Sequence, residues 1–482
     1  FKRTGHERTA EAEAHAIALT EELGGLPLAL EQAGAYLHSN KAIPFQVYLR
    51  RYREEGVSEL NQRLAATGKY PLSVLKTWDI NFEVIRKDYQ VSARILELCC
   101  FLAPDRIPSY IAIFLMMAMF EDNIDIGINL DDYDDLDEDE ALAESMMLME
   151  RLLEPLRRYS LIKALGQAPL FNIHRMVQAV VLDNISRENI AQCLKYLGSS
   201  LMNYLNSLYD HNRWGGNMVL FPHLNPFLKH TEKENFINSD VVHIVRKFAT
   251  MLSERGDFSN AESMYKASIF LAKENLSEHD NYEALIGSNK LCLGNHYLET
   301  REYEKAKTPL VDALHHINKL GDDYYSMLGS IYIKLAFLYR EEGDIDRYST
   351  AMTSAEQILD IINKEPSEVS AETTAAFGGE LLNSEQYEKA IEYLKFALEI
   401  TKNKTGNESI TVARLYENLA VAYLKIENYG LSATASRKSI RIKRELLLPT
   451  NPALAEGLEQ LGSIYTLQQR FDEAIPPLEE AL

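Results

Sequence analysis

The sequence lacks several features that would assign it a chemistry. Its four cysteines, Cys99, Cys100, Cys193 and Cys292, occur singly or side by side, without the Cys-x-x-Cys spacing of zinc and redox sites. We interpret them as reduced core thiols of a cytoplasmic protein. No G-x-x-x-x-G-K-[ST] loop occurs, and no strand ends in an acidic pair that could hold magnesium. Signal peptides and uninterrupted apolar runs of about 18 residues are also missing, so we expect no membrane partner.

Positive charge is scarce as well. The chain of 482 residues has 50 Lys and Arg against 71 Asp and Glu, a net charge of −21. Nucleic acid is therefore not expected as a partner, because phosphate contacts need clustered Lys and Arg. The segment 121–140 has no basic residue and favours a solvated loop. Within it Asp135, Asp137 and Asp139 imitate a calcium loop, but the turn glycine and the closing glutamate are missing. We expect no metal site and no catalytic constellation.

What the sequence does have is a pattern that recurs through its second half. An aromatic or apolar residue returns six times, and the last four intervals are 42 residues each: Phe258, Tyr303, Ile345, Tyr387, Tyr429 and Phe471. A small residue lies nine positions before each of them, and Leu or Tyr lies six before. Small residues follow at three and ten positions after, except Tyr348 in the third copy.

These spacings predict pairs of helices. The two earlier columns share one face of a first helix, and the two later columns share one face of a second. Small residues let the two helices approach closely, while aromatic residues fill the gap between neighbouring pairs. No pair can bury its apolar face alone, so the pairs stack into a solenoid. We expect looser or rearranged packing at Tyr348 in the third copy and at Ser432 in the fifth.

The columns closely resemble the tetratricopeptide repeat, in the 42-residue form found in kinesin light chains. The resemblance implies an all-α fold with about six repeats, whose first helices line an inner groove. Such a groove holds an extended peptide or a helix of a protein partner. The residues that should face it are Asn295, Arg340, Arg414, Asn418 and Lys425.

The first half reads as helices with one short hairpin. A helix over 11–23 stops at Gly24–Gly25, and Pro27 suits the first turn of the next helix. The runs 160–165 and 169–173 favour a hairpin. The expected domains are a helical subdomain at 1–70, a winged-helix module at 72–185, a helical connector at 186–239 with a turn around 214–222, and the solenoid at 240–482.

Short motifs in this half carry a second resemblance. NB-ARC proteins, the STAND class of nucleotide-driven switches, have motifs similar to GGLPLALEQAGAYL (24–37) and FNIHRMVQAVVLD (171–183). LCCFLAPDRIP and LRRYSLIK fit the start and the wing of their winged-helix subdomain. The resemblance implies that Pro27 packs near the adenine and ribose of ADP and that His174 donates a hydrogen bond to a diphosphate oxygen. Arg175 stands where the plant form of the family has aspartate.

Together these patterns predict the regulatory and ligand-sensing part of a STAND-type switch. The solenoid would bind a protein or peptide, and the winged helix would relay this to an upstream module that holds ADP or ATP. The chain reads as a fragment of that protein, with no enzyme activity and no cofactor of its own; the resemblance allows oligomerisation of the full-length protein on activation. The alternative is a kinesin-light-chain-like scaffold or adaptor without nucleotide dependence.

Overall fold

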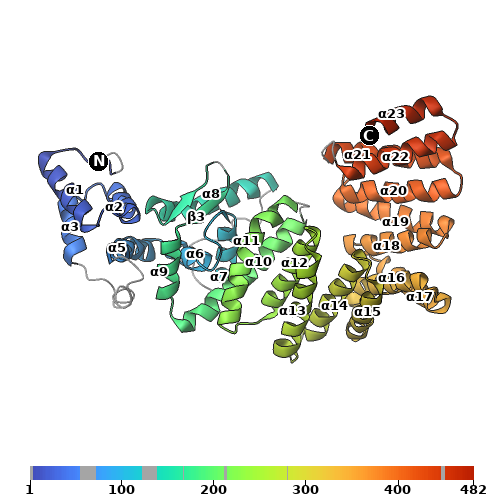
Figure 1. Cartoon of the computed structure of the whole chain (residues 1–482), viewed down its shortest axis with the longest axis horizontal. Coiled ribbons are helices and arrows are strands. Elements are labelled where there is room, and N and C mark those ends of the chain that lie inside the picture. Colours follow the sequence, from blue (N-terminus) through green and yellow to red (C-terminus); the bar gives the residue numbers. More distant parts are fainter. Residues whose placement is uncertain are drawn as a thin grey trace. The chain divides into compact units, whose positions relative to one another are not determined.

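Helices make up nearly all of the chain, as expected for an all-α fold (Figure 1). The computed structural model describes residues 4–54, 72–121, 138–166, 168–210, 214–278, 281–446 and 451–481. The described chain divides into two compact units, Phe1–Leu271 and Ala272–Leu482. Most of the acidic run and of its calcium-like segment lies outside the described residues.

The first unit begins with helices that end and start where the sequence indicates. They are α1 (Ala10–Glu22), α2 (Pro27–Ser39), α3 (Phe45–Glu54) and α5 (Leu72–Asp88). Gly24 and Gly25 follow α1 with φ of +65° and +64°, a left-handed conformation that glycine adopts without strain. Pro27 is the first residue of α2, where its missing N–H costs nothing.

A small antiparallel sheet follows. Its strands are β1 (Ile107–Pro108), β2 (Ile162–Ala164) and β3 (Leu170–Ile173). The helices of the same part of the chain are α6 (Gln90–Cys99), α7 (Ile111–Glu121), α8 (Glu138–Arg158) and α9 (Arg175–Asn184). β3 lies between β1 and β2, and the β2–β3 hairpin has the predicted position. Asn81 of α5 is fully buried and donates to the carbonyls of Gln32 and Tyr159, each at 3.1 Å. This amide therefore joins α2, α5 and the chain just after α8.

The expected turn around 214–222 is wrong. The remaining helices here are α10 (Arg187–Asp210), α11 (Trp214–Lys233), α12 (Ser239–Glu254) and α13 (Phe258–Leu276). Pro222 and Pro226 lie inside α11, where a proline typically costs about 3 kcal/mol. Leu220, Leu224 and Phe227 of the same helix are fully buried, and each such side chain contributes about 1.5–3 kcal/mol. Tertiary packing thus outweighs the local signal of the prolines.

The second unit is a stack of helix pairs, seen most regularly from α18 to α23 in Figure 1. Its helices are α14 (Tyr282–Glu299), α15 (Tyr303–Ile317), α16 (Tyr325–Glu342), α17 (Ile345–Ile362), α18 (Glu368–Asn383), α19 (Tyr387–Thr405), α20 (Ile410–Lys425), α21 (Tyr429–Leu446), α22 (Pro452–Leu467) and α23 (Phe471–Ala481). We number the pairs as copies: α12–α13 is copy one and α22–α23 is copy six. In copies two to six each first helix packs against the second helix of its own copy.

The turn inside each copy is the same in all six. The residue two before the recurring position has a positive φ between 60° and 78°: Gly256, Arg301, Gly343, Glu385, Glu427 and Gln469. The N–H of the following residue donates to the carbonyl of the residue six before the recurring position, at 2.8–2.9 Å. This is the bond of a Schellman cap. Each recurring residue then begins the second helix.

The prediction that aromatic residues fill the gap between pairs is only partly right. Phe258, Ile345 and Phe471, at the recurring position, are 49%, 78% and 59% exposed. They stand at the start of a helix, directed away from the core. The column six positions earlier is buried instead, in five of the six copies: Leu252, Tyr297, Leu381, Tyr423 and Tyr465.

Where the two helices come closest, the small residue nine positions before the recurring residue meets a leucine. The sequence analysis did not single out this column of leucines. A Cβ on Gly294 would lie 2.6 Å from Cγ of Leu310, and one on Gly378 would lie 2.9 Å from Cγ of Leu394. Gly462 and Leu478 make the same contact in copy six. Each leucine lies seven residues after the recurring position, so glycine and leucine are complementary across the pair.

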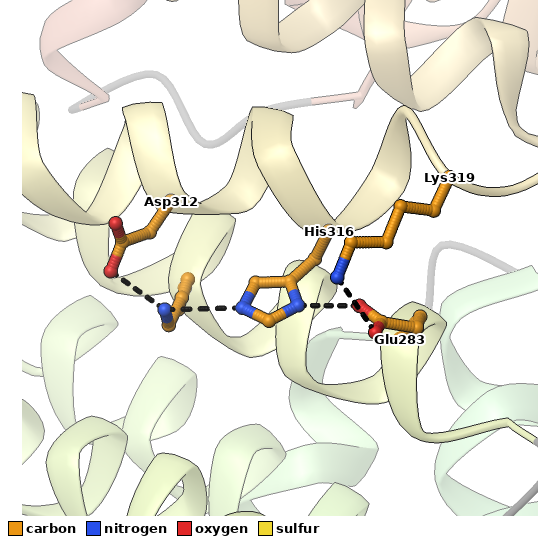
Figure 2. A network of polar contacts seen from close by, with 5 residues as sticks. Glu283, Asp312, His316 and Lys319 are labelled. Atoms are coloured by element: carbon orange, nitrogen blue, oxygen red, sulfur yellow. Dashed lines mark hydrogen bonds and ion pairs between the residues drawn. The ribbon is translucent and has the colours of Figure 1, made fainter.

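A chain of polar contacts also joins the two helices of copy two (Figure 2). Glu283 accepts Lys319 Nζ at 2.9 Å and lies 2.5 Å from His316 Nδ1. Lys290 Nζ, on the other side, lies 3.3 Å from His316 Nε2 and donates to Asp312 at 2.6 Å. A neutral imidazole with its proton on Nδ1 satisfies every contact. The hydrogen bonds from Lys319 and His316 hold the pKa of Glu283 below its usual value.

Two adjacent glycines of α18 test the close approach. Gly378→Ala should lower the free energy of unfolding by about 1–3 kcal/mol, because the new methyl group meets Leu394. Gly379→Ala is the matched control: nothing lies within 4 Å of its Cβ position, so alanine should stabilise the helix by about 0.5–1 kcal/mol. Urea unfolding followed by circular dichroism measures both. Shifts of the same sign would contradict the packing described here.

The polar chain of copy two gives a second prediction. Lys290 is 7% exposed, and Lys290→Met leaves Asp312 and Nε2 of His316 without their donor. We expect a loss of about 1–3 kcal/mol. Lys319→Met removes a half-exposed pair with Glu283 and should cost less than about 0.5 kcal/mol. Thermal melts of the two variants compare them, and equal melting temperatures would rule out the structural role of Lys290.

Candidate functional site

The first helices of copies two to five leave one face uncovered. α14, α16, α18 and α20 each pack against the second helix of their own copy, and α16, α18 and α20 also contact the second helix of the preceding copy. α16 contacts α18 directly, and α18 contacts α20. Their remaining faces therefore follow one another along the stack. We call this surface the inner face.

The five residues assigned to the groove lie on α14, α16 and α20. Asn295 donates to Glu299 at 2.8 Å. Arg340 is held by Glu380 at 2.7 Å and by Glu341 at 2.8 Å. Three more lie together on α20: Arg414, Asn418 and Lys425. Arg414 and Lys425 are exposed, and Asn418 is partly buried.

Charges on the inner-face helices are unevenly paired. Every acidic side chain that the structure describes on α14, α16, α18 and α20 has a partner: Glu283, Glu299, Glu341, Glu342, Glu372, Glu380 and Glu417. Three cations of these helices have no hydrogen bond or contact ion pair with another described residue: Lys334, Arg414 and Lys425. The charged side chains of these helices that lack such a contact with another described residue are thus cations, on a chain of net charge −21. On α22, by contrast, the acids Glu456 and Glu459 are exposed.

Lys334 is the residue that the sequence analysis missed. It lies on α16, partly buried, and burial lowers the pKa of its ammonium group. Glu299 of the neighbouring α14 opposes this pKa shift from beyond contact distance. Lys334 has the same place in copy three as Asn418 in copy five, eleven residues before the recurring position. That shared column was the signal available in the sequence.

In the first unit a pocket of about 350 Å³ lies between α2 and the junction of β3 with α9. Leu28, next to Pro27, lines it from one side and His174 from the other. His174 is the N-cap of α9, and its Nδ1 accepts the N–H of Met176 at 3.2 Å. Charged and polar side chains complete the lining: Glu31, Asp105, Lys163, Asn172 and Arg175.

Arg175 belongs to the balance of charge in this pocket. Its guanidinium lies 3.9 Å from the carboxylate of Asp105, and both side chains are exposed. Lys163 and Arg175 offer donors to an anion, whereas Glu31 and Asp105 repel one. Arg175 therefore pairs with an acid from another part of the chain.

The rest of the described chain offers little further chemistry. A hollow of about 1060 Å³ lies between the α5–α6 junction and α8 and is lined by the exposed Met146 and Met147. Cys99, Cys100 and Cys193 are buried, and burial raises the pKa of Cys193 to about 11. Among the described residues no group of three His, Cys, Asp or Glu is placed to hold a metal ion. None of the described helices is long and apolar enough to cross a bilayer.

Comparison with known proteins identifies the repeats. The family model of the tetratricopeptide repeat matches residues 371–445 and 411–482. Protein KINESIN LIGHT CHAIN-RELATED 3 of Arabidopsis thaliana is 24% identical over 240 residues, which are 49% of this chain and 36% of that protein. The mitochondrial tetratricopeptide repeat protein 19 homolog of Drosophila melanogaster is 21% identical over 260 residues, 52% of this chain and 68% of that protein. The matched part thus spans about a third of the plant relative.

Two solved structures are similar to part of this chain. BtubC (BKLC) from P. vanneervenii is 21% identical, with a TM-score of 0.41, over 46% of this chain and 89% of that chain. The apo form of RapI is 16% identical, with a TM-score of 0.33, over 40% and 68%. The chain is therefore all-α, it carries tetratricopeptide repeats at its C-terminus within a solenoid, and its relatives include a kinesin-light-chain-related protein.

Proposed function

We propose that this chain is a cytoplasmic protein-binding scaffold whose solenoid holds an acidic segment of a partner on the inner face. The observation that carries the proposal is the pairing of charges there. Lys334, Arg414 and Lys425 have no hydrogen bond or contact ion pair with another described residue, while the described acids of the same helices all have a partner. Opposite charge on a partner would both steer its approach and fix its register.

A carboxylate of the partner would be stabilised next to Lys334, deep in the groove. Its ammonium is partly buried, and burial lowers its pKa because the charged form loses solvation. A carboxylate at contact distance would return part of that lost stabilisation. Arg414 and Lys425 are exposed and would add smaller, salt-dependent contributions.

Room for a partner is present between these cations. α18 follows α16 and precedes α20 in the stack, and Gly379 on α18 has no neighbour within 4 Å of its Cβ position. A peptide backbone can approach a glycine surface closely. The similarity to a kinesin-light-chain-related protein supports a scaffold more than a switch.

Charge reversal tests the proposal. Arg414→Glu should weaken binding of an acidic peptide about fivefold or more, because it turns an attraction into a repulsion. Fluorescence anisotropy with a labelled decapeptide of alternating Glu and Leu measures the affinity, with the Gln–Leu peptide as the neutral comparison. The matched control is Arg437→Glu, the same change at an exposed position on the second helix α21.

Arg414→Glu should also leave the melting temperature unchanged, because Arg414 is exposed and pairs with no described residue. Equal affinities of the Glu–Leu and Gln–Leu peptides for the unmodified chain would rule out acidic recognition. An equal loss of affinity in Arg414→Glu and Arg437→Glu would mean that binding depends only on the net charge of the chain.

A second function, the nucleotide-dependent switch, is favoured by one observation. The order α6, β1, α7, α8, β2, β3 is that of a winged helix, and Leu28 and His174 line one pocket beside it. His174, Lys163 and Arg175 fit the phosphates of ADP, while Glu31 and Asp105 oppose them, so the lining fits a nucleotide in part. ADP bound there would bring its diphosphate to the N-terminus of α9 and so link α2 to α9.

The switch can be tested on the natural gene product that contains this chain. We expect ADP to remain bound through purification. His174→Ala should reduce the amount of bound ADP about fivefold or more, because one donor to the diphosphate is lost. Acid extraction and chromatography quantify the nucleotide. His38→Ala, an exposed histidine that does not line this pocket, is the control. No bound ADP, or the same amount in both variants, would remove the switch and leave the scaffold.

A further inference from the structure

The joint between copies three and four differs from the others. α19 packs broadly on α20, and α21 on α22, but α17 makes a smaller contact with α18. Instead the two first helices α16 and α18 lie directly against each other. Copy three is also the copy in which Tyr348 replaces the small residue, and this side chain is only partly buried against the core. The local rearrangement expected at Tyr348 thus coincides with an unusual joint.

Among the described residues two ion pairs link these copies: Lys389 of α19 lies 2.6 Å from Glu356 of α17, and Arg340–Glu380 joins the two first helices. Arg340 of α16 donates through Nε to Oε1 of Glu380 on α18 at 2.7 Å, and the Glu380 side chain is only 4% exposed. Burial raises the pKa of Glu380, and Arg340 opposes that rise. Arg340 is 27% exposed, so a partner can reach it, and it already has a second acid, Glu341, at 2.8 Å.

We infer that Arg340 is exchanged between the joint and the partner: a carboxylate of a segment bound on the inner face takes Arg340 from Glu380, and the joint between copies three and four loosens. The inference rests on the proposed binding of an acidic segment. Arg340 lies on α16 six residues after Lys334, about 9 Å along the helix axis and about 120° around it. A segment anchored at Lys334 that crosses α16 toward α18 therefore brings a further carboxylate to Arg340.

Exchange has a consequence for protons. Glu380 without Arg340 is a buried carboxylate that keeps a hydrogen bond from the neutral Asn383, and its neighbours Glu341 and Tyr348 supply no positive charge. Losing the cation raises the pKa of Glu380 further, because the contribution that opposed burial disappears. The complex therefore binds more protons than the free chain. By linkage, affinity should rise as the pH falls toward the pKa of Glu380.

Titration calorimetry in two buffers of different ionisation enthalpy measures this proton uptake directly. With the Glu–Leu decapeptide we expect uptake of up to one proton by the unmodified chain at pH 6. Glu380→Gln should abolish the uptake and tighten binding about fivefold, because the competitor for Arg340 is gone. Glu341→Gln is the matched control, because it removes the other acid that contacts Arg340. Glu341 is more exposed than Glu380 and does not connect the two copies, so proton uptake should persist in this variant.

A label pair reports the joint without altering it. Glu304→Cys and Glu388→Cys place spin labels at equivalent exposed positions of copies two and four, in a Cys292→Ser background. Peptide should broaden or shift their distance distribution. This measurement also decides the matter if Glu380→Gln does not fold.

The outcomes separate the two ideas. A peptide that does not bind the unmodified chain removes the proposed function, and the inference with it. A peptide that binds without proton uptake, with equal affinity for Glu380→Gln and an unchanged label distance, overturns the inference alone. Arg340 would then be a fixed part of the joint, and the groove would remain a binding surface.

Discussion

In copies two, four and six the solenoid depends on one steric constraint: the two helices of a copy must come close enough for a leucine of one to touch the backbone of the other. Glycine at 294, 378 and 462 makes this possible, because any side chain there would occupy the space of Leu310, Leu394 or Leu478. The constant turn between the helices then fixes their register, since its backbone bond always joins the same two positions. Stacking of copies, and therefore the inner face, follows from these two local features.

The inner face has its character because polar groups are satisfied unevenly. Many charged side chains of the solenoid form contacts between helices, as in the polar contacts from Lys319 to Asp312 and in the pair Arg340–Glu380. The cations left over are those that a partner can use. If these cations line one groove, as we propose, an otherwise acidic chain attracts a segment of opposite charge to that surface.

The sequence predicts the repeats well and the site less well. Periodic small and aromatic residues are set by packing within one copy, so their spacing survives in the sequence, and the all-α solenoid followed directly. The exposure of Phe258 and Ile345 did not, because position in a column does not say which way a helix start points. The capture of Arg340 by Glu380 was also hidden: the two lie 40 residues apart and meet only after stacking. Lys334 was missed although its column had been used for Asn418. The helix through Pro222 shows the opposite limit, in which burial overrides a strong local signal.

The identical turns have a consequence for how such a chain can change in length. Because each copy closes its own turn and meets its neighbours through similar faces, a whole copy can be duplicated or lost by recombination while the surrounding hairpins keep their geometry. The joint between copies three and four is an exception. Arg340 and Glu380 belong to different copies, so a crossover there would strand a buried acid, and we expect variation in copy number to spare it.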